Sequence, residues 1–231
     1  MVLAASIFAF LVTFTLPIGG CFAIVTKNGR YLKPLLSGVY AYIGLQLTAL
    51  LPFIQTLSDD LSSLGPTLSA YAAACIMAVL AEGIRAVSAH YTLGKSEISQ
   101  GDCLASGFGS WALEAVLTTG LAAISIVTNY TALAPTIDGT VMLLSGLERL
   151  AVLPITVLFA YLTIMSYKKR SPLMFVLSCA LRGVLNGTLS ALQAAGLSAS
   201  VIIGGLWGVA LAACAVIWKI IKPKGLFKKS K

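Results

Sequence analysis

Residues 70–90 read AYAAACIMAVLAEGIRAVSAH, an apolar run that could cross a bilayer and that still carries a glutamate and an arginine. A helix needs about 20 largely apolar residues to span ~30 Å of hydrocarbon. Similar runs recur along the 231-residue chain, in which 58% of the residues are hydrophobic and 10% are charged, with a mean hydropathy of +0.93. The sequence therefore predicts an all-α polytopic membrane protein.

We expect about seven membrane-spanning helices. The expected spans cover residues 2–25, 34–56, 66–90, 104–128, 139–166, 172–194 and 197–221. The longest polar connection between them, Leu93 to Asp102, is too short to form a soluble unit. Residues 1–231 are therefore expected to form a single integral membrane domain, in which residues 222–231 are a basic tail.

Basic residues outside the spans predict the orientation. They all fall on one side of the seven-span arrangement: Lys27, Arg30, Lys33, Lys95, Lys168, Lys169, Arg170, Lys219 and the lysines of the tail. The other side carries only Asp59, Asp60 and Asp138. By the positive-inside rule, the N-terminus is outside and the C-terminus is cytoplasmic. The formal net charge of +8 then faces anionic lipid headgroups, and we expect no nucleic-acid partner.

Three glutamates and three arginines interrupt the apolar runs. They are Glu82, Arg85, Glu114, Glu148, Arg149 and Arg182. Each charge near the bilayer midplane costs roughly 2.5 to 3.5 kcal/mol, so six charges that balance in sign predict one internal polar cluster. Two roles are open for this cluster. Its charges either form ion pairs that only hold the helices together, or they also face a bound molecule.

Helical spacing suggests which of these charges meet. Glu82 and Arg85 share a face and can form an ion pair within one helix. Glu148 and Arg149 diverge by about 100° and are expected to serve different neighbours. Arg182 is expected to reach Glu114, Glu148 or both on other helices, with Asn186 on the same wall. Small and polar residues also form stripes, which are Gly107, Ser110, Glu114 and Thr118 on one helix, and Cys179, Arg182, Asn186, Ser190 and Gln193 on another.

Four short motifs resemble the YhfC family of intramembrane peptidases, which is itself related to CAAX-prenyl-protease-like membrane proteins. The motifs are Ala81-Glu82-Gly83-Ile84-Arg85, Gly107-Phe108-Gly109-Ser110-Trp111-Ala112-Leu113-Glu114-Ala115, Glu148-Arg149-Leu150 and Cys179-Ala180-Leu181. The resemblance covers residues 75–190. It implies the fold of that family, and by position it makes Glu82, Glu114 and Glu148 the candidate catalytic residues.

The departures from the family pattern concern its metal chemistry. Ala81 stands where the family has a first glutamate, and Ser110 and Cys179 stand where it has histidines. A hydrolytic zinc site normally takes three protein ligands, and histidine is the usual neutral donor. The one histidine of this chain, His90, is expected near a membrane interface. We therefore predict no metal, no other cofactor and no stoichiometric zinc.

The resemblance implies a pseudopeptidase, a relative that keeps the charged framework without the catalytic chemistry. Such a protein would bind another integral membrane protein, a hydrophobic peptide or a lipid in a polar cavity, in the membrane of a prokaryotic cell. An active glutamate-dependent intramembrane protease and a subunit of a small-solute transporter are the alternatives. The expected binding residues are Glu82, Arg85, Ser110, Glu114, Glu148, Arg149, Cys179, Arg182 and Asn186.

Overall fold

The computed structural model describes residues 2–52, 54, 56, 61, 63–93, 98–133 and 137–221. Within these ranges the chain forms helices and short connections, with no strand. Six helices are long and apolar enough to cross a membrane. The prediction of an all-α protein with membrane-spanning helices is therefore confirmed at this level. The Asp59-Asp60 loop, Lys95 and the basic tail from residue 222 lie outside the described residues.

Two of the six spanning helices contain a π-helical turn. The first runs through α1 (Val2–Phe10), the π-helical turn η1 (Leu11–Thr15) and α2 (Leu16–Lys27). The other runs through α6 (Gln100–Ala115), the π-helical turn η3 (Val116–Gly120) and α7 (Leu121–Thr128). The turn η1 lies just before Pro17, which has no N–H to donate to the preceding helical turn.

The remaining spanning helices are α5 (Pro66–Leu93), α9 (Gly139–Lys169), α10 (Pro172–Ala194) and α11 (Ala199–Ile221). A further helix, α3 (Leu32–Ala49), has 18 residues and follows the 3-10 turn η2 (Gly29–Tyr31). A single helical turn, α8 (Tyr130–Leu133), follows α7. These boundaries lie within a few residues of the expected spans, except that α3 ends at Ala49, seven residues before the expected end of span 34–56.

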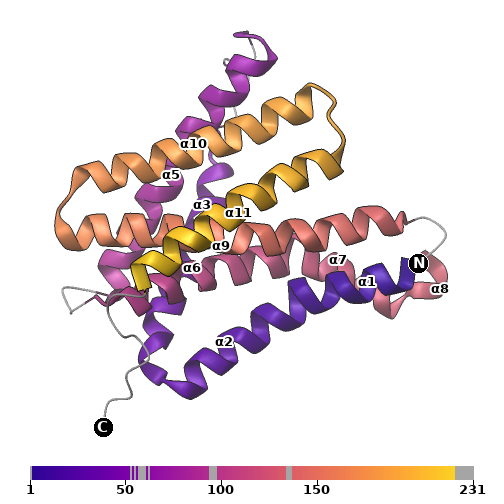
Figure 1. The fold of residues 1–231 in the computed structure, drawn as a ribbon, viewed down its shortest axis with the longest axis horizontal. Helices are drawn as coiled ribbons and strands as arrows, with labels where there is room; N and C mark the ends of the chain where they lie inside the picture. Colours follow the sequence, from indigo (N-terminus) through magenta and orange to yellow (C-terminus); the bar gives the residue numbers. More distant parts are fainter. Residues whose placement is uncertain are drawn as a thin grey trace.

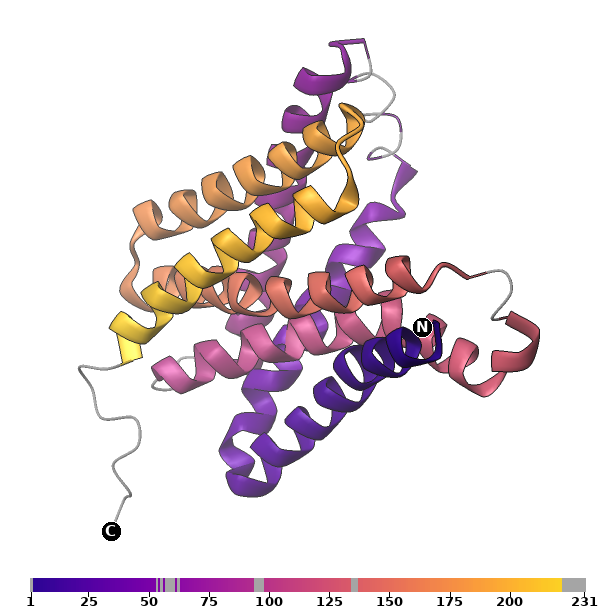
Figure 2. The same ribbon diagram turned by 45° about the vertical axis from the view of Figure 1, so that its right-hand side comes forward.

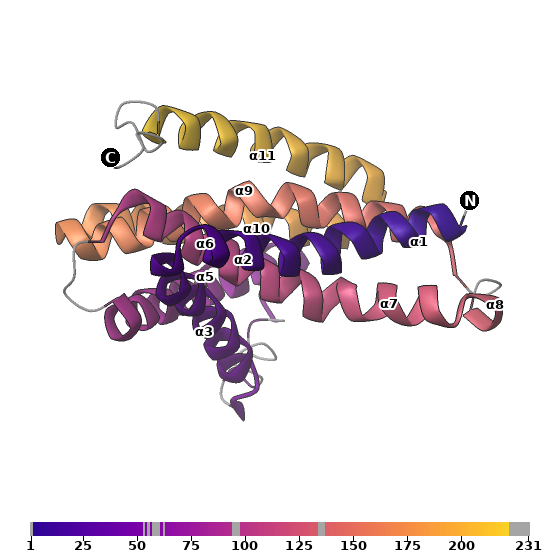
Figure 3. The same ribbon diagram turned by 90° about the horizontal axis from the view of Figure 1, so that it is seen from below.

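Helix α9 is the centre of the bundle. It contacts α1, α5, α6, α10 and α11. Its most apolar window is 56% buried, against 33% or less for the other five spanning helices. Figure 1 shows α3 and α5 crossing the other helices steeply, and the turned view in Figure 2 shows the same crossing. Seen from below, α11 covers one face of the bundle and α3 projects from the opposite face (Figure 3).

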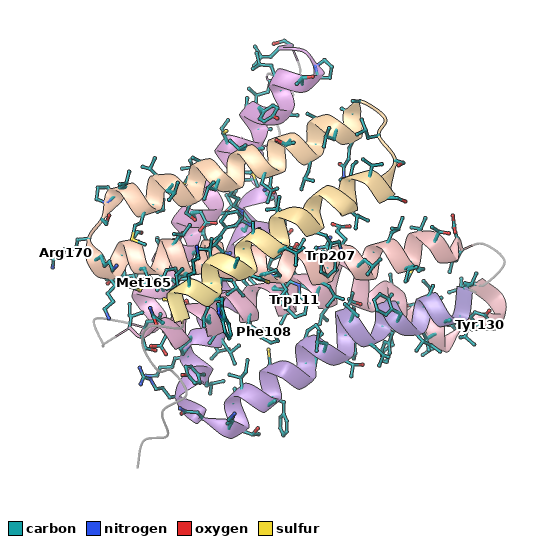
Figure 4. The ribbon with its side chains drawn as sticks, in the orientation of Figure 1. Phe108, Trp111, Tyr130, Met165, Arg170 and Trp207 are labelled. Atoms are coloured by element: carbon teal, nitrogen blue, oxygen red, sulfur yellow. The ribbon has the colours of Figure 1, made fainter. Side chains whose placement is uncertain are left out.

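Basic side chains gather at one end of the bundle, which we call the basic end. It carries Lys27, Arg30, Lys33, Lys168, Lys169, Arg170 and Lys219. Figure 4 shows Arg170 at this end and Tyr130 at the other. Polar contacts hold the basic end together: Arg30 pairs with Asp102 at 3.3 Å, and Lys168 Nζ donates to the Ile98 carbonyl at 2.5 Å.

The start of α6 is fixed by a capping box at the basic end. The Ser99 hydroxyl accepts from the Asp102 backbone N–H, and the Asp102 carboxylate accepts from the Ser99 backbone N–H. This reciprocal pair satisfies two backbone donors that the first helical turn cannot use. His90 is exposed nearby, and its Nδ1 lies 2.7 Å from the Tyr167 hydroxyl oxygen. The interfacial position of His90 stays a prediction.

Glycines let α3 and α6 approach to backbone contact. A Cβ atom added at Gly38 would lie 1.9 Å from the Ser106 carbonyl oxygen, and one at Gly109 would lie 2.3 Å from the Leu35 carbonyl oxygen. Without hydrophobic driving force between helices in lipid, such close packing is a main source of helix association. The contact between these two helices forms one wall of the site described next.

Candidate functional site

The carboxylate of Glu82 is the most buried charge of the cluster, because its side chain is fully shielded from solvent. Arg85, one helical turn further along α5, donates from Nη1 to both Glu82 oxygens at 3.2 Å. Arg182 of α10 donates to Oε1 at 2.5 Å, and Thr163 of α9 donates to Oε2 at 2.5 Å. One carboxylate thus joins three helices. The predicted ion pair between Glu82 and Arg85 is confirmed.

Side chains around this carboxylate extend the network. Thr163 Oγ1 lies 3.1 Å from the Ser178 hydroxyl oxygen, and Ser178 also donates to the Phe159 carbonyl at 3.4 Å. The guanidinium carbon of Arg182 lies 5.8 Å from the centroid of the Phe159 ring. A cation over an aromatic face gains electrostatic stabilisation. These contacts hold Arg182 in place for its pairing with Glu82.

A second group of charges centres on Arg149 of α9. Its Nη1 donates to Glu114 of α6 at 2.7 Å, and its Nη2 donates to Glu148 at 3.0 Å. The indole of Trp111 donates to the Arg149 backbone carbonyl at 2.7 Å. Pro154 lies five residues further along α9, where it can offer no N–H to the preceding turn. Trp111 lies near the middle of the bundle (Figure 4).

A cavity of about 180 Å³ lies between the two charge groups. Its walls come from α3, α5, α6 with η3, α9 and α10. The polar residues that line it are Tyr42, Gln46, Arg85, Ser110, Glu114, Thr118, Arg149 and Arg182. We call this space the polar cavity. The predicted single internal cluster is thus two ion-paired groups that share one cavity.

Two predicted pairings are wrong. Arg182 pairs with Glu82 and not with Glu114 or Glu148. Glu148 and Arg149 do not serve different neighbours, because they form an ion pair with each other while Arg149 also holds Glu114. Long arginine and glutamate side chains reach across the angle that separates adjacent residues on a helix.

The other expected binding residues divide between the polar cavity and its surroundings. Ser110 lines the cavity. Cys179 is buried next to Ser178 and does not line it. Asn186 lies at a different hollow, between α5 and α10, together with Ser190 and Gln193. The expectation that Asn186 shares the wall with Arg182 is therefore wrong for this cavity.

Thr163 belongs to the site but was not expected from the sequence. A signal for it exists in the spacing of α9, where Arg149, Thr156 and Thr163 recur at seven-residue intervals. Seven residues are close to two helical turns, so these polar side chains share one face of the helix. Tyr42 and Gln46 of α3 were also missed, and they are one helical turn apart on the wall of the cavity.

The donor set of this site does not fit a catalytic metal ion. Every carboxylate in the two charge groups is ion-paired with arginine, and the side chain of Glu82 is fully buried. An arginine beside a carboxylate opposes a second cation at the same oxygens. Across the described residues, no group of three or more His, Cys, Asp and Glu side chains is arranged to hold a metal. The absence of bound zinc stays a prediction.

Fold and site together define a class: an all-helical protein with six helices able to cross a membrane and with ion-paired charges buried inside the bundle. Comparisons with protein-family models, with curated proteins and with solved structures found no match.

Proposed function

We propose that this protein is a pseudopeptidase, similar to the YhfC family, that binds a membrane component in its polar cavity. The observation that carries the proposal is the pairing of all three candidate catalytic glutamates, Glu82, Glu114 and Glu148, with arginine. A general base needs a carboxylate oxygen that can reach a water molecule. Both oxygens of Glu82 already accept from arginine or threonine.

The bound component in this proposal is another membrane protein, a hydrophobic peptide or a lipid. The polar cavity supports it because arginine and hydroxyl groups line a space that is set within helices long enough to span the bilayer. Polar groups at such depth are costly, and they commonly mark a site where something binds or passes.

The proposal includes seven spans, with α3 as the second, in the cell membrane of a prokaryote. Helix α3 starts after η2 at the basic end and leads toward the far end of α5 (Figure 1). At ~1.5 Å per residue its 18 residues extend about 27 Å along the helix axis. The described basic residues outside the spans then share the cytoplasmic side, and the N-terminus lies outside.

This topology predicts opposite labelling at the two ends of α9. In a variant without its native cysteines, a cysteine at Lys169 is expected to be shielded from a membrane-impermeant thiol reagent in intact cells. A cysteine at Thr140 should react, because it lies at the other end of the same helix. Labelling at position 169 but not at position 140 would show that the protein has the opposite orientation.

Binding in the polar cavity is tested by a photo-crosslinking amino acid placed at Thr118, an exposed residue that lines the cavity. In native membranes we expect a specific crosslinked product at this position and none from the same group at Ser125, which is exposed two helical turns away. Ser110→Ala and Cys179→Ala should leave the crosslink nearly unchanged. Equal crosslinking from positions 118 and 125 would contradict binding in the cavity.

Incubation of the purified protein with membrane peptides separates the proposal from catalysis. We expect no hydrolysis. If the protein cleaves a peptide, and Glu82→Gln or Glu114→Gln abolishes cleavage while folding is retained, the protein is an enzyme and the proposal is wrong.

A further inference from the structure

The charged wall of the polar cavity is mainly cationic. Arg85, Arg149 and Arg182 line it, and Glu114 is the one carboxylate among the lining residues. Glu82, which balances two of these arginines, lies behind the wall with its oxygens occupied. Guanidinium groups donate hydrogen bonds and accept none, so the cavity offers more donors than acceptors.

Two of these donors are buried without a partner in the described structure. They are Nε of Arg85 and Nε of Arg149, and the Arg85 side chain is only 3% exposed. Because these two Nε atoms expose almost no surface, an acceptor in the polar cavity would meet other donors. Nη2 of Arg85 and Nη2 of Arg182 make no hydrogen bond in the described structure, and both side chains line the cavity. Arg85 and Arg182 belong to different helices, α5 and α10, and each uses Nη1 to pair with Glu82.

Size and access limit what can enter. A cavity of about 180 Å³ is near the ~150 Å³ that holds one benzene molecule, so it takes a small head group and not a whole lipid. Gln46 and Thr118 are the exposed residues among its polar lining, and they mark an opening between α3 and η3. Their sequence neighbours Leu47 and Leu117 are 60% and 48% exposed. An apolar chain can therefore extend from the opening along leucine side chains.

We propose that the polar cavity binds one carboxylate group at the end of an apolar chain, an inference that rests on the proposed binding function. A planar carboxylate matches the paired N–H groups of guanidinium. A phosphate head group carries more negative charge beside Glu114, so it fits this wall less well. Two sources supply the same chemistry, a long-chain fatty acid and the C-terminus of a hydrophobic peptide.

Equilibrium binding of labelled dodecanoate to the protein in lipid nanodiscs tests this proposal, with empty nanodiscs measuring partition into lipid. Dodecanoate is expected to bind at least tenfold more tightly than dodecanol and than dodecyl phosphate. If peptides are the source, a hydrophobic peptide with a free C-terminus should displace dodecanoate at least tenfold better than the amidated peptide does. If fatty acids are the source, the two peptides should not differ in this way. Equal binding of dodecanoate and dodecanol would overturn the proposal.

Variants locate the bound carboxylate. Arg149→Gln removes one donor and should weaken dodecanoate binding at least tenfold. Thr118→Trp fills the opening without changing any charge, and it should have a similar effect even if Arg149→Gln does not fold. Ser125→Trp is the matched control and should bind as the unchanged protein does. Unchanged binding in the folded Thr118→Trp variant would place dodecanoate elsewhere and refute the assignment.

The two proposals fail in different experiments. A crosslink specific to position 118, without selectivity for carboxylate, refutes the carboxylate site and leaves the binding function standing. Selective binding of dodecanoate without a crosslink in native membranes supports the carboxylate site and refutes the proposed binding function.

Discussion

Replacing Glu82 by alanine is expected to lower the free energy of unfolding by roughly 3–5 kcal/mol, the cost of breaking a buried ion pair from one side. The substitution leaves Arg85, which is 3% exposed, and Arg182 without their carboxylate partner. It also removes the acceptor for the Thr163 hydroxyl. The apparent thermal midpoint and the yield of monodisperse protein in detergent report the loss.

Glu148→Ala is the matched control for this prediction. Glu148 also pairs with an arginine, but its side chain is 40% exposed, and exposed pairs contribute about 0–1 kcal/mol. Its effect on the thermal midpoint should therefore be small. Equal losses for Glu82→Ala and Glu148→Ala would show that burial does not set the importance of these pairs.

A triple variant tests whether the buried charges are needed for folding or for binding. Replacing a buried ionic group by apolar residues of similar volume is often neutral or stabilising, whereas removing one partner is not. Glu82→Leu combined with Arg85→Leu and Arg182→Leu should therefore be more stable than Glu82→Ala. We expect the triple variant to fold and to lose the crosslink from position 118. A folded triple variant that keeps the crosslink would separate the charges from binding.

The sequence predicts the helices of this protein well because the signal is local. A run of about 20 apolar residues must form a helix in lipid, since every backbone N–H and C=O has to be satisfied within the segment. Charges inside such runs likewise have to face protein. The pairing within α5, between Glu82 and Arg85, follows from helical spacing alone.

The partner of Arg182 depends on the depth of each residue in the bundle as well as on its spacing within a helix. Arg182 lies ten residues after the start of α10 at Pro172, and Glu82 lies eleven residues before the end of α5 at Leu93. Both of these helix ends are on the basic side, so the two residues share one depth. Glu148 lies nine residues from the opposite end of α9, at Gly139. Counting depth from the basic side would have favoured Glu82.

Gly38→Ala is expected to separate α3 from α6 and to prevent much of the protein from folding. The new Cβ would lie 1.9 Å from the Ser106 carbonyl oxygen and 2.6 Å from the Ser110 backbone nitrogen. Overpacking a close contact typically costs about 1–3 kcal/mol, and here the obstacle is backbone, which cannot rotate away. Tyr42, one turn after Gly38, and Ser110 both line the polar cavity, so the same shift would widen it.

Gly83→Ala in α5 controls for the general effect of a methyl group in a helix. A Cβ added at Gly83 meets nothing within 4 Å, and alanine in place of glycine in a helix is favourable by roughly 0.5–1 kcal/mol. The thermal midpoint should therefore fall for Gly38→Ala and stay level or rise for Gly83→Ala. If Gly38→Ala folds with an unchanged midpoint, the close approach of α3 and α6 is not what holds this wall of the cavity. If its midpoint falls, the spacing of these two helices sets both the stability of the bundle and the width of the space between its charges.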